Sequence, residues 1–270
     1  MENFNKLLFH PSALGEIYTG VKKGWSVDES LTCKRQLLKI YREIKYNRYY
    51  SFSNKQTEKG NRMENQAIEL LSLYRKEFLK KNESRLTNGY FDGEPDIITK
   101  HQTIDTKCSW SLDSFPHPLV DTIDTLPKEK VKIDYELQGY GYMDLTGLRQ
   151  HTIAYCLVNT PLNFLTKAKE DLYYRMDCPG DGDRNFEEYV NELQRIERNM
   201  IFDKATFLRD NPNYDFENKN WIYDIPVSER VVEFTISYDE KIMSNLKSRI
   251  DECRNWMNAN FKLTNDLIAA

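Results

Sequence analysis

The sequence of 270 residues contains no apolar run that approaches the roughly 18 residues of a membrane-spanning helix. Its first twenty residues lack the basic segment and apolar stretch of a secretory signal, so we expect an intracellular, cytoplasmic protein without a membrane partner. The five cysteines are odd in number and far apart, which argues against a disulfide framework and excludes a CxxC metal pair. This cysteine usage predicts a reducing compartment.

Several catalytic motifs are also missing from the chain. The four histidines show no HExxH or paired spacing, and neither a GxSxG motif nor a GxxxxGK[ST] loop is present. These absences argue against zinc hydrolysis, Ser/His/Asp catalysis and ATP use within this chain. No internal repeat, low-complexity tract or linker is visible, which predicts one elaborated domain over residues 1–270.

The residues that are present predict a folded protein with an uneven charge distribution. Hydrophobic residues make up 40% and charged residues 30%, as in ordinary globular proteins. The net charge is −4, yet residues 1–90 hold seventeen Lys and Arg against ten Asp and Glu. A basic N-terminal third favours a polyanionic partner, with a merely solvated helix surface as the alternative.

Apolar periodicity and turn residues predict a mixed α/β (α+β) fold. A basic N-terminal helical region (1–57) would precede a core (about 58–160) that reads helix, three strands, helix, strand, followed by a C-terminal extension (161–270). The expected elements are helix 31–48, loop 50–60, helix 61–81, extended segments near 85–91, 95–99 and 102–107, loop 110–128, helix 130–146, strand 151–160, helices 162–176 and 184–208, strand 230–238 and helix 239–260.

The stretch GEPDIITKHQTIDTKCSW, residues 93–110, gathers the residue types that phosphodiester hydrolysis needs. Because side chains alternate along a strand, Asp105 and Lys107 point to one face and Thr106 to the other. A hairpin would place Asp96 beside that pair. Carboxylate oxygens suit Mg²⁺ and Mn²⁺, and an ammonium group can stabilise charge that develops on a phosphate. The alternative is a solvent-exposed hairpin with scattered charges.

Two helices are expected to bring further polar side chains to the same place. Glu64 borders the apolar face of the helix before the strands and would supply a third carboxylate, with Glu69 and Glu77 as competitors. Gln138 and Tyr142 are four residues apart, so they share one helix face. Both could contact nucleic acid or support the metal ligands.

The order Glu64, Pro95-Asp96, Asp105-Thr106-Lys107 and Gln138-Gly-Tyr-Gly-Tyr142 resembles the PD-(D/E)xK nuclease superfamily. The similarity is to the branch of lambda-type exonucleases, YqaJ-like viral recombinases and RecB-type nucleases. It covers about residues 58–160 and implies a restriction-endonuclease-like core, a central mixed sheet flanked by helices. The segment HPSALG, residues 10–15, is similar to the opening of YqaJ-like proteins, whereas residues 161–270 match no part of the family pattern.

The resemblance implies a role for each motif residue. Glu64, Asp96 and Asp105 would bind the metal, the Thr106 carbonyl would add a ligand, and Lys107 would be the catalytic lysine. The second acid is Asp105 where many members carry Glu, and the motif permits either. No four-cysteine set surrounds the core, which argues against the iron–sulfur branch of the family.

The function implied by the resemblance is Mg²⁺-dependent hydrolysis of DNA, with Mn²⁺ able to substitute. The expected enzyme is a 5′–3′ exodeoxyribonuclease of the phage or mobile-element type, which acts on duplex ends in recombination. A homo-oligomer and a single-strand annealing or recombination partner protein are compatible with this expectation. Two alternatives remain open: an endonuclease of the restriction or repair type, and a catalytically silent DNA-binding or interaction protein with the nuclease fold.

Overall fold

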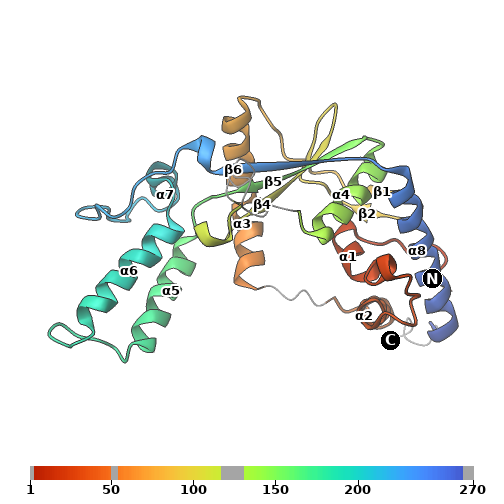
Figure 1. Ribbon diagram of the computed structural model, residues 1–270, viewed down its shortest axis with the longest axis horizontal. Helices are drawn as coiled ribbons and strands as arrows, with labels where there is room; N and C mark the ends of the chain where they lie inside the picture. The colour runs from red at the N-terminus through yellow and green to blue at the C-terminus, as the bar shows by residue number, and fades with distance from the viewer. Residues whose placement is uncertain (1–2, 50–53, 117–130, 264–270) are drawn as a thin grey trace.

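A computed structural model gives the structure of the protein and describes residues 3–49, 54–116 and 131–263 (Figure 1). Among these residues, no helix is both long and apolar enough to cross a membrane. The elements follow in this order: η1 (Pro11–Ala13), α1 (Leu14–Ile17), η2 (Val21–Lys23), α2 (Leu31–Tyr46), α3 (Lys55–Arg75), β1 (Leu86–Thr87), β2 (Asp92–Gly93), β3 (Ile97–Ile98), β4 (Thr103–Cys108), η3 (Leu112–Ser114), α4 (Ile133–Thr146), β5 (Gln150–Cys156), α5 (Leu162–Arg175), α6 (Phe186–Met200), α7 (Lys204–Asp210), η5 (Val227–Glu229), β6 (Val231–Ser237) and α8 (Glu240–Asn260).

The central sheet has four strands in the order β3-β4-β5-β6. β3 pairs antiparallel with β4, β4 runs parallel to β5, and β5 pairs antiparallel with β6. Neighbouring parallel strands need a crossover connection, and α4 lies in the connection between β4 and β5. β1 and β2 form a separate two-stranded sheet. The predicted mixed α/β architecture, with a mixed sheet flanked by helices, is confirmed.

Helices α3 and α4 cover opposite faces of this sheet. Ile104 of β4 and Ala154 of β5 point toward α3 and share an apolar core with its buried side chains. Because strand side chains alternate, Asp105 and Lys107 point to the other face, and both contact α4 through Gln138. The polar end of β4 is therefore presented between the two helices.

The N-terminal segments pack with the final helix. Side chains from α1, α2 and α4 share one apolar core with α8. Buried Arg254 of α8 donates hydrogen bonds to the carbonyls of Leu7 and Gly89, each at 2.7 Å. The shared core includes Leu14 and Ile17 of α1, which borders the candidate site described below.

Residues 162–222 form an arm, built from α5, α6, α7 and the segment after α7, that extends away from the sheet (Figure 1). The arm has its own apolar core, which includes Leu165, Met200 and Phe207. Beside that core, Glu197 is only 2% exposed. Its carboxylate accepts hydrogen bonds from the Tyr214 hydroxyl at 2.8 Å, the Trp221 ring N–H at 2.7 Å, the Lys219 ammonium at 3.1 Å and the Lys169 ammonium.

Several sequence predictions of elements are wrong in detail. Residues 55–60, predicted as loop, belong to α3, because the Asn54 side chain caps the helix by accepting from the Thr57 N–H at 2.8 Å. The segment near 85–91 contributes β1, outside the central sheet, so only two strands of that sheet precede α4. The predicted helix 184–208 is two helices, because Asp203 caps α7 and accepts from the Thr206 N–H. Residues 117–128 of the predicted loop lie outside the described residues.

Candidate active site

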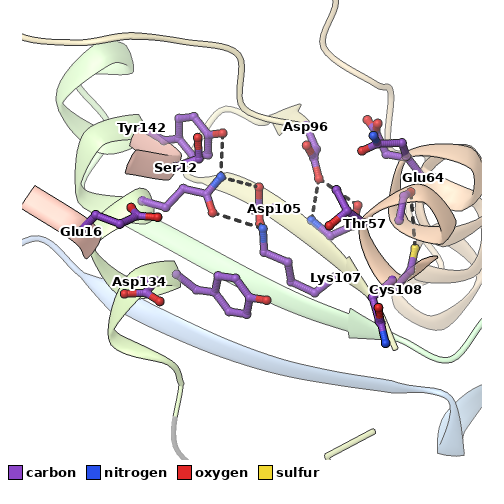
Figure 2. Close-up of a pocket in the computed structure, with 16 residues that line it drawn as sticks. Ser12, Glu16, Thr57, Glu64, Asp96, Asp105, Lys107, Cys108, Asp134 and Tyr142 are labelled. Carbon is purple, nitrogen blue, oxygen red and sulfur yellow. Dashed lines mark hydrogen bonds and ion pairs between the residues drawn. The ribbon is translucent and has the colours of Figure 1, made fainter. Parts of the chain in front are cut away.

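A cleft of about 670 Å³ lies between α3 and α4, beside the C-terminal half of β4 (Figure 2). η1 and α1 contribute Ser12 and Glu16 to its lining, and α4 contributes Asp134. The structure brings every residue that the sequence predicted for the site into this one cleft: Glu64, Asp96, Asp105, Thr106, Lys107, Gln138 and Tyr142.

Asp96 reaches the cleft because of the β3–β4 hairpin. Ile97 pairs with Ile104, so Asp96, one residue before β3, lies across from the middle of β4. Its Oδ2 atom accepts two hydrogen bonds from Thr106, from the backbone N–H at 2.7 Å and from the hydroxyl at 2.8 Å. The carboxylate is thereby held beside Asp105, as Figure 2 shows. The predicted hairpin geometry is observed.

Lys107 and Asp105 lie on the same face of β4 and form an ion pair. The Asp105 residue is only 3% exposed. The Lys107 ammonium also donates to Oε1 of Gln138 at 3.1 Å and lies 4.5 Å from the centre of the Tyr135 ring. Three neighbours therefore fix the position of this ammonium group at the base of the cleft.

Gln138 links the acid, the lysine and Tyr142. Its Nε2 group donates to the Tyr142 hydroxyl at 3.0 Å and, more weakly, to Oδ1 of Asp105 at 3.5 Å. With its Oε1 atom engaged by Lys107, the amide orientation is set on both sides. The sequence left two roles open for Gln138 and Tyr142, contact with nucleic acid and support of the metal ligands. In the structure Gln138 contacts the predicted metal ligand Asp105 and the predicted catalytic Lys107, and Tyr142 contacts Gln138.

His151 of β5 packs against α4, the helix that carries Gln138 and Tyr142, and the sequence did not predict this contact. It is fully buried at the start of β5, where its Nδ1 atom lies 2.8 Å from the Thr103 hydroxyl. A Cβ at Gly139 would come within 2.3 Å of the imidazole, so α4 can approach β5 this closely only with glycine there. Burial lowers the pKa of His151 to about 4, so the ring is neutral. Its sequence signal, a histidine beginning a buried strand, did not indicate this contact.

Glu64 lines the cleft from α3, whereas its competitors do not. The Glu64 carboxylate pairs with the Lys81 ammonium at 2.9 Å. Glu69 instead forms an exposed ion pair with Arg209 at 2.8 Å, and Glu77 is an exposed residue beyond the end of α3. Glu64 is therefore the carboxylate of this helix that faces the site.

Electrostatic repulsion is concentrated at Asp96. Burial, followed by the nearby charge of Asp105, raises the pKa of Asp96 to about 7, although the two hydrogen bonds from Thr106 oppose the shift. For Lys107, burial would lower the pKa, but the Asp105 carboxylate outweighs it and the pKa is raised. The cleft therefore holds a stably protonated lysine beside two carboxylates that repel one another.

The donor set fits a hard divalent cation. In the described part of the chain no three His, Cys, Asp or Glu side chains are already arranged to hold a metal ion, since Glu64 is paired with Lys81 and Asp105 with Lys107. Oδ2 of Asp105 is buried, and its contact among the described residues is the ion pair with the Lys107 ammonium. A cation between Asp96 and Asp105 would relieve their repulsion, and carboxylate oxygens are the ligands that Mg²⁺ prefers.

Comparison with known proteins identifies the fold. No protein-family model and no curated protein matches the sequence. Among solved structures, a phage-related exonuclease from Haemophilus somnus 129PT is similar, with a TM-score of 0.62 and 25% identity over 94% of this chain and 95% of that chain. The chain has the PD-(D/E)xK nuclease fold. The resemblance inferred from the motif residues is therefore confirmed.

A second solved relative shows the same nuclease fold. An alkaline exonuclease from Laribacter hongkongensis is 12% identical, with a TM-score of 0.52 over 94% of this chain and 90% of that chain. Its structure in complex with dAMP gives a TM-score of 0.51 over 93% and 88% of the two chains. The likeness extends well beyond residues 58–160, where the sequence motifs lie, and includes most of the C-terminal 110 residues that matched no family pattern.

Proposed function

We propose that this protein is a Mg²⁺-dependent deoxyribonuclease that hydrolyses phosphodiester bonds at the ends of duplex DNA. The main support is the half-buried Asp96 and the buried Asp105, which lie with Lys107 at the base of one cleft. The similarity to a phage-related exonuclease over 94% of the chain supports the nuclease assignment and favours an exonuclease.

The positions of the acidic residues support a role for each of them. Asp96, Asp105 and the Thr106 carbonyl would hold Mg²⁺ or Mn²⁺, and Glu64 would join them on leaving Lys81. When bound, such an ion polarises the scissile phosphate and lowers the pKa of a coordinated water. The Thr106 hydrogen bonds orient Asp96 before any ligand arrives, so less reorganisation is needed on binding.

Lys107 would act on the charge that develops on the phosphate during the reaction. Its raised pKa keeps the ammonium protonated at neutral pH, and Gln138, Asp105 and the Tyr135 ring hold it in place. A positioned charge of this kind in a protected site stabilises a transition state more than a mobile one in water. Gln138 and Tyr142 are then positioning residues for Lys107.

The finer assignment is a 5′–3′ exonuclease of a phage or mobile-element recombination system. The phage-related exonuclease with similar structure supports the exonuclease part of this assignment, and the polarity is what the resemblance to lambda-type exonucleases implies. DNA with free double-stranded ends would be the substrate, with Mn²⁺ able to replace Mg²⁺. Separate 5′ and 3′ end labels on linear duplex DNA test the polarity, since a 5′–3′ enzyme releases the 5′ label first.

The activity is tested with linear and covalently closed circular duplex DNA, each incubated with Mg²⁺ or with EDTA. Progressive shortening of the linear DNA alone, abolished by EDTA and by Lys107→Ala, is the expected result. Equal cleavage of the circular DNA would instead indicate an endonuclease. DNA binding without metal-dependent cleavage would overturn the enzyme assignment and favour a catalytically silent binding protein.

A further inference from the structure

The exposed face of α2 carries three cations in one line. Arg35, Lys39 and Arg42 are separated by four and three residues, so they project from the same side of the helix, and all three are exposed. Cys33 and Leu37 on the opposite side are fully buried in the core shared with α8. Arg35, Lys39 and Arg42 together are called the α2 stripe, which at 1.5 Å per residue is about 10 Å long.

The charges of the α2 stripe have no partner among residues 3–49, 54–116 and 131–263, where none of the three forms an ion pair or a hydrogen bond through its side chain. Three cations of α3 and the segment after it, which lie nearer the cleft, are instead paired with carboxylates. The pairs there are Lys55 with Asp171 at 3.3 Å, Arg62 with Glu58 at 2.5 Å, and Lys81 with Glu64 at 2.9 Å.

The cleft itself cannot supply long-range attraction for DNA. The described residues that line it include five carboxylates and one ammonium, that of Lys107, which is already paired. A bound divalent ion offsets part of this charge but does not reverse it. A polyanion that enters such a cleft must therefore be attracted and held by cations elsewhere on the surface.

The α2 stripe lies close enough to serve that purpose. α2 packs on α1, which contributes Glu16 to the cleft. Only residues 47–54 separate α2 from α3, whose first turn lines the cleft through Gln56 and Thr57. Figure 1 shows α2 and the N-terminal end of α3 at the same lower edge of the molecule.

We propose that Arg35, Lys39 and Arg42 contact the sugar–phosphate backbone of DNA outside the cleft and hold the substrate while its end is processed. The inference rests on the proposed function, because it takes DNA as the substrate of the cleft. Three cations along 10 Å match the charge density of a duplex, which carries one phosphate about every 3.4 Å along each strand. A membrane surface fits less well, because the apolar face of α2 is buried within the protein.

The test is a triple variant, Arg35→Gln, Lys39→Gln and Arg42→Gln, which removes the charges and keeps good helix formers. Binding of a fluorescent 30-base-pair duplex is measured by anisotropy in EDTA across a series of salt concentrations. We expect the affinity at about 0.1 M salt to fall at least about tenfold. The slope of log K against log salt should fall by about 2.7, since each phosphate contact contributes about 0.9.

A matched control removes three exposed cations that lie elsewhere: Lys100→Gln, Arg198→Gln and Lys241→Gln. It carries the same change in net charge, and thermal melting verifies that both triple variants are folded. The control should bind DNA within about twofold of the wild-type protein. An equal loss in the two variants, or an unchanged salt slope in the stripe variant, would overturn the proposal. The proposal would also be overturned if the stripe variant lost binding to anionic lipid vesicles while its DNA binding stayed intact.

Cleavage measurements separate this inference from the proposed function. With Mg²⁺ present, the stripe variant should show a raised KM for a 30-base-pair duplex and a smaller effect on a duplex of six base pairs. If the stripe variant cleaved and bound DNA like the wild-type protein, the role of the α2 stripe would be overturned and the proposed function would stand. Wild-type protein that binds DNA through the stripe but never cleaves it would overturn the proposed function alone.

Discussion

Asp96 in the cleft is a half-buried carboxylate and Glu197 in the arm a buried one, and their surroundings differ. Burial alone would raise the pKa of Glu197, yet hydrogen bonds from Lys169, Tyr214 and Trp221 outweigh it and lower the pKa to about 2. Burial and then the negative charge of Asp105 raise the pKa of Asp96 to about 7, although hydrogen bonds from Thr106 oppose the shift. The arm neutralises the charge of Glu197 with cations, whereas Asp96 forms no ion pair with the described residues.

This difference separates a structural role from a functional one. A carboxylate surrounded by donors stabilises the fold, and its loss leaves several buried groups without a partner. A carboxylate held against another carboxylate lowers the stability of the fold. Side chains with pKa values perturbed in this way are concentrated where ligands bind. Substitution of the two acids should therefore have opposite consequences.

The largest expected effect is on catalysis at Asp96. Asp96→Asn should lower DNA cleavage by about 10³-fold, because it removes a metal ligand and a charge from the centre. The thermal midpoint of the metal-free protein should stay constant or rise, since the repulsion with Asp105 is removed. Both are measured against Glu69→Gln, an exposed acid on α3 that should behave like wild type. Equal loss in that control would show that the centre is misassigned.

Glu197→Gln should give the opposite result. A native pKa of about 2 against 4.5 predicts about 3 kcal/mol of stability at pH 7, which is lost as pH falls from about 4.5 to about 2. Urea unfolding should show this difference at pH 7 and a smaller one at pH 3, while cleavage at 25 °C remains near wild type. Glu192→Gln on the same helix, which removes a surface ion pair with Arg195, should cost less than about 1 kcal/mol. A stable Glu197→Gln protein would contradict the account of the arm.

Lys59 is a buried cation that forms no ion pair with a carboxylate of the described residues. Its ammonium donates to the Trp110 carbonyl and the Thr160 hydroxyl, each at 3.0 Å, and burial lowers its pKa from 10.5 to about 7. Below pH 7 the folded protein carries the full cost of this charge. The cost is relieved as pH rises toward 10.5, because the folded state releases its proton first.

The variant Lys59→Met lacks this titration. Between pH 7 and pH 9 the wild-type protein should therefore gain about 2 kcal/mol of stability relative to Lys59→Met. Urea unfolding of both proteins at the two pH values measures the change, and any pH effect from other groups cancels in the difference. A constant difference between the two proteins would mean that Lys59 does not titrate in this range.

The smallest expected effect is at Tyr142. Tyr142→Phe removes the hydroxyl that fixes the Gln138 amide, and loss of one such hydrogen bond, about 1 kcal/mol, should lower kcat about fivefold. Tyr140→Phe is the control, because the Tyr140 hydroxyl bonds to the Ser237 carbonyl instead. Similar rate losses in the two variants would show that Tyr142 acts only through general packing of α4.

The local part of the site could be predicted from sequence. Strand alternation alone puts Asp105 and Lys107 on one face, and a short hairpin is enough to add Asp96. The helix pattern favoured Glu64, but not its ion pair with Lys81, which requires the chain after α3 to return beside β3. Contacts between residues close in sequence could be predicted, whereas contacts that depend on the chain turning back on itself could not.

The remaining parts depend on contacts between distant segments. In the sequence His151 is an isolated histidine, because its fit against Gly139 exists only once α4 packs on β5. Glu197 resembled any surface acid of an amphipathic helix, since its partners come from α5 and from the segment after α7. Residues 161–270 are divided into two parts: the arm, and the strand β6 and helix α8 that complete the core. This division follows from tertiary packing alone.

The central claim, that the uncompensated charge of the cleft binds a catalytic metal, is tested most directly by anomalous diffraction from crystals soaked in Mn²⁺. We expect one strong peak between Asp96 and Asp105, within about 2.3 Å of their oxygens and of the Thr106 carbonyl. The same peak should vanish in Asp96→Asn crystals. An empty cleft in wild-type crystals, from protein whose DNA cleavage persists in EDTA, would contradict the account.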